Sequence, residues 1–293
     1  MILPLFLCCN QKSKVSAKWV NKFADMYKQQ LVSIQPYSSS TIKPKQSVII
    51  AVHGFGSSPF ECRELKKYIE QHSTALVSNV YLGKHQSLDE FSNSSWQDWL
   101  QPICDEYQKC IKLGYEHIIL VGCSTGATLI LQGLKGNCFL PSQALKHIVL
   151  IDSFIDLQSK YLDYIDWLAP LIFSPKVNLS CKEANHWLPI RPKKALLELN
   201  KLKNITKKDL KKGLVFSSHI NVSIFKSKHD PIMLQHNSKL IYEGLTKKTP
   251  CNVTITTIDS CLHVFSRLKG RKNIAKNDKD NQIILFDYLL KVI

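Results

Sequence analysis

The sequence lacks the patterns by which a chain commonly holds a metal ion. It has no C-x-x-C pair and no cluster of His and Cys residues at ligand spacing. A helix-turn-helix signature and a basic platform interleaved with aromatic residues are also missing. These absences predict a protein that works without a metal or cofactor and has no nucleic acid partner.

Acidic residues are scarce. The chain has 23 Asp and Glu against 39 Lys and Arg, a formal net charge of +16 at pH 7. Eight of the lysines lie in one stretch whose only acidic residues are Glu198 and Asp209: Lys193, Lys194, Lys201, Lys203, Lys207, Lys208, Lys211 and Lys212. A face of this charge is attracted to anionic surfaces. Peripheral contact with an anionic membrane is one interpretation, and a solvated lysine face is the other.

No disulfide framework is indicated, although the chain has 10 cysteines. Eight are dispersed, several in segments expected to be buried, which favours reduced thiols and a cytoplasmic protein: Cys62, Cys104, Cys110, Cys123, Cys138, Cys181, Cys251 and Cys261. Cys8 and Cys9 end an apolar N-terminal run that is too short to cross a bilayer and is a poor signal peptide. Lipidation of one of these two, with membrane association through the N-terminus, is the alternative.

What the sequence does contain is a nucleophile-elbow pattern. Gly122-Cys123-Ser124-Thr125-Gly126 follows an apolar run, 117–121, and precedes a helix-like stretch, 127–134. Glycines are needed on both sides because side chains there would collide with the neighbouring strand and helix of such a sharp turn. The pattern predicts that Ser124 is a nucleophile, and an ordinary strand-to-helix turn is the alternative.

A second glycine-rich turn, His53-Gly54-Phe55-Gly56, follows the apolar run 48–52. Such a turn frees backbone N–H groups, which stabilise the oxyanion in acyl transfer. The candidate oxyanion-hole donors are the N–H of Phe55 and the N–H of Thr125, the residue after the nucleophile. A tight turn without a catalytic role is the alternative.

A candidate acid and base follow in the chain order nucleophile, acid, base. Asp230 comes after the strand-like segment 219–226, and His263 comes after the strand-like segment 252–258. Catalytic groups of a parallel sheet gather at the carboxyl ends of its strands, so Ser124, Asp230 and His263 are expected to converge. His263 would take the serine proton, and Asp230 would orient the imidazole.

Rival residues remain for both roles. Asp152 and Asp259 also follow apolar runs and are alternative acids. His229 and His236 lie close to Asp230 in the sequence. The order of the residues and their places at strand ends favour Asp230 and His263.

These motifs together resemble a known family. The chain is similar to the α/β-hydrolase branch that contains bacterial carboxylesterases and monoacylglycerol lipases. The segments of this chain that carry the similarity are His53-Gly54-Phe55, Ser58-Pro59, Glu61-Cys62-Arg63-Glu64-Leu65, Trp96-Gln97-Asp98-Trp99-Leu100, Gly122 to Leu129, Ser227-Lys228-His229-Asp230 and Leu262-His263-Val264. The resemblance implies a serine hydrolase of carboxylic esters with a Ser124-Asp230-His263 triad, a Phe55/Thr125 oxyanion hole and no cofactor. The chain departs from the family at Gly83-Lys84-His85-Gln86, where a His-Gly pair is usual, and at Leu262, which is often Gly.

The expected fold is an α/β-hydrolase fold, a mostly parallel sheet flanked by helices. We predict strands near 48–52, 76–82, 117–121, 147–151, 222–226 and 253–258, and helices over 60–72, 96–113, 127–134, 234–245 and 281–292. Residues 1–46 form an N-terminal extension, and 47–153 with 214–293 form the core.

Residues 154–213 interrupt the alternation of strands and helices and change from aromatic to lysine-rich. Relatives in the family carry a cap after the sixth strand, so the resemblance implies a helical cap or lid here. Its apolar residues are expected to line an acyl pocket: Tyr161, Tyr164, Trp167, Leu168 and Phe173. Ordinary packing helices without substrate contact are the alternative.

Two classes of function stay open. The first is an esterase or lipase acting on a small-molecule or lipid ester, with thioester hydrolysis or acyl transfer as chemistries that use the same acyl-enzyme. The second is a noncatalytic module of this fold that binds a lipid or a partner. The ordered triad favours the enzyme.

Overall fold

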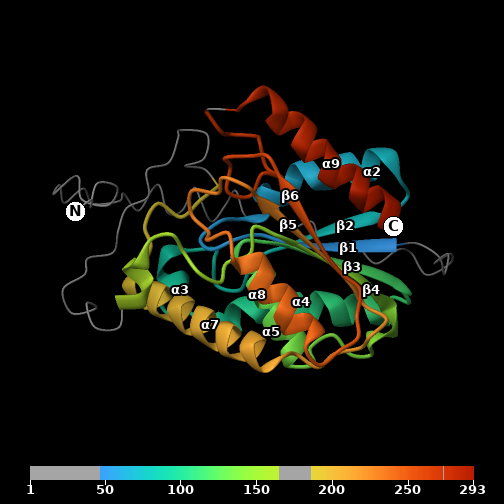
Figure 1. Cartoon of the computed structure of the whole chain (residues 1–293), viewed down its shortest axis with the longest axis horizontal. Coiled ribbons are helices and arrows are strands. Elements are labelled where there is room, and N and C mark those ends of the chain that lie inside the picture. Colours follow the sequence, from blue (N-terminus) through green and yellow to red (C-terminus); the bar gives the residue numbers. More distant parts are fainter. Residues whose placement is uncertain (1–46, 165–185, 273) are drawn as a thin grey trace.

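The computed structural model describes residues 47–164, 186–272 and 274–293 (Figure 1). The expectations for the extension 1–46, for Cys8 and Cys9, and for the cap residues Trp167, Leu168 and Phe173 lie outside the described residues.

The described chain is built on a six-stranded sheet in which every pair of neighbouring strands is parallel. The strand order is β2-β1-β3-β4-β5-β6. The strands are β1 (Ser47–Val52), β2 (Leu76–Val80), β3 (His117–Cys123), β4 (Leu145–Ile151), β5 (Asn221–Ser227) and β6 (Val253–Ile258). The expectation of a mostly parallel sheet is confirmed for this part of the chain.

Helices cover both faces of the sheet, giving three layers (Figure 1). The helices are α2 (Arg63–His72), α3 (Leu88–Ser92), α4 (Trp96–Lys112), α5 (Thr125–Lys135), α7 (Lys193–Lys212), α8 (Asn237–Thr246) and α9 (Lys276–Val292), with short 3-10 turns η1 (Pro59–Cys62), η2 (Ser142–Ala144) and η3 (Lys160–Tyr164). One face packs against α2 and α9, and the other against α4, α5, α7 and α8.

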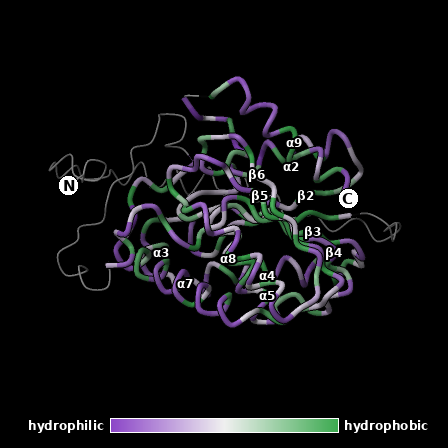
Figure 2. The backbone as a smooth tube through the Cα atoms, viewed as in Figure 1, coloured by the Kyte–Doolittle hydropathy of each residue, from purple (hydrophilic) through white to green (hydrophobic). Residues whose placement is uncertain are grey.

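Most residues of the central strands β1, β3 and β4 are apolar because both faces of the sheet are covered. In β1, alternate residues enter different cores: Ile49 packs on the α2 and α9 side, and Ile50 on the α4 and α5 side. Both are fully buried. In Figure 2 these strands are largely hydrophobic, whereas α7 is largely hydrophilic.

The segment 154–213 lies between β4 and β5, the fourth and fifth described strands. Its lysine-rich half forms α7, which packs beside α5 and α8 through Leu199, Leu202 and Leu210. The aromatic half is described only as far as Tyr164, where Tyr161 packs against the core and the Tyr164 side chain is exposed. No described helix is both long enough and apolar enough to cross a membrane.

Candidate active site

Four polar side chains lie where neighbouring strands end. Ser124 and Asp152 directly follow β3 and β4, and Asp230 and His263 lie in the loops after β5 and β6. Because all these strands are parallel, their carboxyl ends share one edge of the sheet. Residues far apart in the sequence are therefore brought to one place.

The backbone at Ser124 has the sharp turn expected of a nucleophile elbow. Its φ is 51° and its ψ is −116°, a conformation that a non-glycine residue rarely adopts. A Cβ on Gly122 would lie 2.6 Å from the backbone nitrogen of Ala127, and one on Gly126 would lie 2.6 Å from the Val52 carbonyl oxygen. The two flanking glycines are thus required by the helix on one side and the strand on the other.

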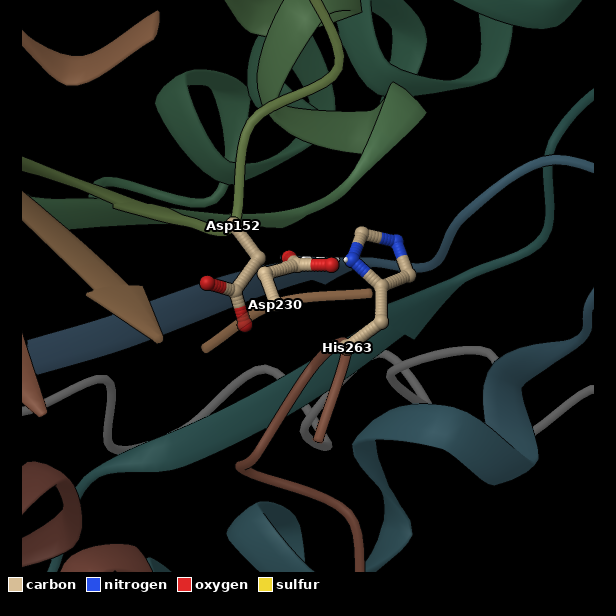
Figure 3. A group of neighbouring side chains, drawn as sticks. All are labelled: Asp152, Asp230 and His263. Carbon is tan, nitrogen blue, oxygen red and sulfur yellow. Dashed lines mark hydrogen bonds and ion pairs between the residues drawn. The ribbon is translucent and has the colours of Figure 1, made fainter. Parts of the chain in front are cut away.

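Ser124, His263 and Asp230 form a continuous hydrogen-bonded chain. The Nε2 of His263 lies 2.9 Å from the Oγ of Ser124, and its Nδ1 lies 2.8 Å from Oδ2 of Asp230. An ionised carboxylate only accepts hydrogen bonds, so Nδ1 carries the proton and Nε2 is free to accept the serine hydroxyl. Figure 3 shows the Asp230 carboxylate directed at the imidazole of His263.

The hydrogen bond with Asp230 makes His263 more basic than an ordinary imidazole. Burial by itself would lower the pKa of His263, but the hydrogen bond to Asp230 and the charges of Asp230 and Asp152 raise it above its usual value. This arrangement suits a group that must hold a proton for part of a reaction and then release it.

The backbone N–H groups of Phe55 and Thr125 are the candidate oxyanion donors. Among the described residues, neither the N–H of Phe55 nor that of Thr125 donates to a protein acceptor. Thr125 is the first residue of α5, so its N–H lies at the positive end of a helix. A Cβ on Gly54 would come within 3.2 Å of the Ser124 Cβ, so the turn that precedes Phe55 lies against Ser124.

The rival residues have other contacts. Asp259 has an exposed side chain, 70% accessible, and lies near Lys228 and His229. His236 contacts Asp156 at 3.0 Å. Asp259, His229 and His236 form no hydrogen bond or ion pair with Ser124 or His263.

Asp152 is buried within the site, although it does not contact the imidazole nitrogens. Ligand atoms of Asp152, Asp230 and His263 lie within 4.8 Å of one another, a separation that could suit a cation (Figure 3). However, each carboxylate oxygen already accepts at least one hydrogen bond from the protein. The donor set therefore fits a network of proton-bearing groups better than a metal site.

Sequence reasoning missed several residues that support the site. Glu61 is buried, and its Oε2 accepts the N–H of Gly54 at 2.6 Å, which fixes the turn before Phe55. Arg271 donates to the carbonyl oxygens of His263 and Val264. Glu61 stands inside a motif of the family resemblance, whereas nothing local marks Arg271.

The segment after the undescribed part of 154–213 packs directly on the glycine-rich turn 53–56. The N–H of Leu188 donates to the Gly56 carbonyl oxygen at 2.9 Å, and the Arg191 guanidinium lies 5.6 Å from the centre of the Phe55 ring. Arg267 follows His263 in the chain, and its guanidinium carbon lies 4.4 Å from the centre of the Trp187 ring. This segment therefore contacts both the turn 53–56 and the loop that carries His263.

The loop that departs from the family pattern packs beneath the same turn. His85 is fully buried, and its ring lies 6.4 Å from that of Phe55. The N–H of Leu82 donates to Nε2 of His53 at 3.2 Å. Burial lowers the pKa of His53 to about 4, so this histidine is neutral and serves as a fixed acceptor.

The comparisons with known proteins agree with this geometry at the level of the fold. No protein-family model and no curated protein matches the sequence. Among solved structures, one from work on LipS and LipT, two metagenome-derived lipolytic enzymes, matches with TM-score 0.65 and 17% identity over 85% of this chain and 94% of that one. A monoacylglycerol lipase from Paleococcus ferrophilus matches with TM-score 0.63 and 13% identity, over 84% and 95% of the two chains.

A soluble variant of monoglyceride lipase from Saccharomyces cerevisiae, solved with a substrate analogue, matches with TM-score 0.61 and 11% identity over 88% of this chain and 90% of that one. Matches of this extent and low identity establish the architecture and leave the chemistry to the site itself. The chain has the fold of the α/β-hydrolase superfamily.

Proposed function

We propose that the protein is a serine hydrolase that cleaves carboxylic esters, of the carboxylesterase or monoacylglycerol lipase kind, through an acyl-enzyme on Ser124. The observation that carries the proposal is the hydrogen-bonded chain from Ser124 through His263 to Asp230, at distances of 2.9 and 2.8 Å. A strained serine together with two N–H groups that have no acceptor in the described part of the chain is the arrangement that acyl transfer requires.

In the first half of the reaction, the Ser124 oxygen attacks the ester carbonyl carbon while Nε2 of His263 takes the hydroxyl proton. Asp230 stabilises the imidazolium through Nδ1. The N–H groups of Phe55 and Thr125 stabilise the oxyanion, and each such donor typically contributes about 3 kcal/mol. The carbon–oxygen bond to the alcohol then breaks, and the alcohol leaves with the proton from Nε2.

In the second half, water replaces the alcohol. His263 takes a proton from water as the water oxygen attacks the acyl carbon, and the proton returns to the Ser124 oxygen when the acyl bond breaks. The residues need no cofactor for either half. A noncatalytic binding module would have no use for the strained backbone at Ser124, so this observation favours the enzyme.

The proposed substrate is a lipid or other apolar ester. The matched monoglyceride lipase was solved with a substrate analogue, and we assign 154–213 of this chain as a cap over the site. Two contacts support the assignment: Leu188 with Gly56, and Arg191 with Phe55. Such a cap would exclude water from the acyl-enzyme and shelter an acyl chain.

Ser124→Ala tests the proposal. Alanine keeps the same Cβ and fits the elbow, but it removes the attacking oxygen. We expect labelling by a fluorophosphonate probe to disappear and hydrolysis of p-nitrophenyl esters to fall by at least about 10³-fold, with an unchanged circular dichroism spectrum. A folded variant that keeps wild-type activity would exclude Ser124 as the nucleophile, and p-nitrophenyl esters compared with thioesters of the same acyl group would separate the two chemistries.

A further inference from the structure

The buried carboxylate of Asp152 joins the loops that carry the candidate acid and base. Its Oδ1 accepts the N–H of Ser227 at 2.6 Å, and its Oδ2 accepts the N–H of Val264 at 2.9 Å. Ser227 ends β5, three residues before Asp230, and Val264 directly follows His263. In Figure 3, Asp152 approaches the pair from a separate strand end. One side chain is therefore bonded to both loops.

The hydroxyl of Ser227 extends this connection. Its Oγ lies 2.7 Å from the carbonyl oxygen of Leu262 and 3.0 Å from Oδ2 of Asp152. A hydroxyl has one proton to donate, and the shorter contact favours Leu262 as its acceptor. Asp152 and Ser227 thus hold the residues on both sides of His263.

The backbone at Val264 needs such support. Its φ is 57°, in the left-handed region where a β-branched residue is rare. Arg271 holds the Val264 carbonyl oxygen from the other side at 3.1 Å. A strained residue persists only where its surroundings fix it, and the Val264 N–H has Asp152 as its acceptor.

We propose that Asp152 is a positioning residue for the general base: by accepting the Val264 N–H, its carboxylate maintains the strained backbone at that residue and so aims the His263 ring at Ser124. This inference rests on the proposed function. It gives Asp152 a role distinct from that of the acid, because Asp230 occupies Nδ1 of His263.

Asp152 also acts on the imidazole through its charge. Burial raises the pKa of Asp152 to about 6, with the charge of His263 opposing and that of Asp230 adding to the rise. At neutral pH Asp152 is therefore largely ionised and helps to raise the pKa of His263, as Asp230 and Glu61 also do. Arg271 faces the same loop but binds its backbone carbonyls.

Asp152→Asn is the informative substitution because it keeps the side-chain volume. One carboxylate oxygen becomes an NH₂ group, so either the Ser227 N–H or the Val264 N–H must face a donor. The test is a double-mutant cycle with Val264→Gly, since glycine adopts a positive φ without strain. Val264 is buried, and the V264G single variant is the matched control for the lost side chain.

We expect D152N to lower kcat for p-nitrophenyl butyrate about 100-fold with little change in KM, because misaiming the base affects the chemical step. In the V264G background the same substitution should lower kcat by about tenfold or less. The D259N variant should retain wild-type kcat, because Asp259 is an exposed carboxylate outside the site.

The acidic limb of the pH profile of kcat/KM gives an independent measurement of the effect of Asp152 on His263. The base works when neutral, and D152N removes a negative charge that raises the pKa of His263, so the limb should move to lower pH. Equal losses of kcat in both backgrounds, or a D152N variant with wild-type kcat and an unmoved limb, would overturn the inference.

Failure of the proposed function is distinguishable from failure of this inference. If the proposed function is wrong, the wild-type protein neither hydrolyses the esters nor reacts with the fluorophosphonate probe. The role of Asp152 is then judged by NMR from the His263 Nδ1–H signal, which should weaken or disappear in D152N and persist in D259N. A D152N protein with the wild-type imidazole signal would contradict the positioning role.

Discussion

At the scale of single residues, the contacts of its two oxygens set Asp230 apart from the other acids. Its Oδ1 accepts the N–H groups of Ile232 and Met233 at 2.7 and 3.0 Å, which leaves Oδ2 for His263. The loop thus fixes the carboxylate before the imidazole meets it. Asp259 has no comparable anchor for its carboxylate, because its exposed side chain lies only near Lys228 and His229.

We therefore expect Asp230→Asn to reduce kcat for ester hydrolysis by about 10³- to 10⁴-fold. An amide that presents its NH₂ to Nδ1 favours the wrong tautomer of His263, and the charge that stabilises the imidazolium is lost. Asp259→Asn, the matched control, should change kcat by less than about twofold. Steady-state kinetics on folded variants check this prediction, and a larger loss in D259N than in D230N would show that the acid is assigned to the wrong loop.

The sequence marked Ser124, Asp230 and His263 as candidates because each follows its own apolar run in a recognisable order. It also placed Asp152 among the candidate acids, but only three-dimensional contacts show that Asp230 bonds to the imidazole, whereas Asp152 bonds to loop backbone. Glu61, Arg191 and Arg271 act through contacts with backbone or rings of distant segments. No local pattern encodes such contacts.

At the scale of structural elements, the turn from β3 into α5 depends on close approach of backbones. Gly126 faces the end of β1, and a Cβ there would lie 2.6 Å from the Val52 oxygen and 2.7 Å from the His53 oxygen. Both atoms belong to the main chain of a central strand and its following turn, so they cannot move without disturbing the sheet. The elbow and β1 are therefore fixed against each other.

Gly126→Ala should lower the melting temperature by about 5 to 10 °C, or prevent folding, because overpacking against backbone cannot relax. Gly114→Ala is the control: Gly114 has a φ of 83°, but a Cβ there meets no atom within 4 Å. That variant carries only the conformational cost of about 1 kcal/mol, or about 2 to 4 °C. Thermal unfolding followed by circular dichroism separates the two, and equal shifts would remove the steric argument.

The elements that sequence alone located best are two strands, the fully buried β1 and the largely exposed edge strand β6. β1 and β6 were expected at 48–52 and 253–258 and occur at Ser47–Val52 and Val253–Ile258. The strand expected at 76–82 ends at Val80, because the following residues turn toward His53 and His85. α7 was expected only as lysine-rich cap sequence, since its leucines become a packing face only when α5 and α8 lie beside it.

At the scale of the whole molecule, the lysines of α7 differ in burial and in pairing. Lys203 is buried against Asp163, and Lys207 pairs with Asp156 at 2.6 Å. Lys201 is exposed but pairs with Glu198 at 2.6 Å. Four further lysines are exposed: Lys194, Lys208, Lys211 and Lys212. We define these four as the α7 lysine face, whose charge an anionic surface could contact.

If the α7 lysine face contacts lipid headgroups and 154–213 shelters an acyl chain, activity should depend on both surface charge and chain length. Each buried CH₂ contributes about 0.8 kcal/mol, so kcat/KM should rise about fourfold per methylene from acetate to medium-chain esters. Binding to vesicles that contain phosphatidylserine should weaken as salt is raised, because exposed charges are screened over about 8 Å at physiological ionic strength. Vesicle cosedimentation and p-nitrophenyl esters of graded length measure the two effects.

Replacing the four lysines of the α7 lysine face by glutamate should weaken vesicle binding and leave turnover of a soluble ester unchanged, since these side chains are exposed and outside the hydrogen-bonded site. The matched control replaces four exposed lysines of α9 and the segment before it: Lys272, Lys276, Lys279 and Lys291. α9 covers the opposite face of the sheet (Figure 1), so the two variants have equal net charge but differently placed charges. If both variants weaken vesicle binding equally, net charge alone attracts the membrane. Vesicle binding that does not change with salt concentration would exclude an electrostatic contact. A preference for acetate would exclude the sheltered acyl chain.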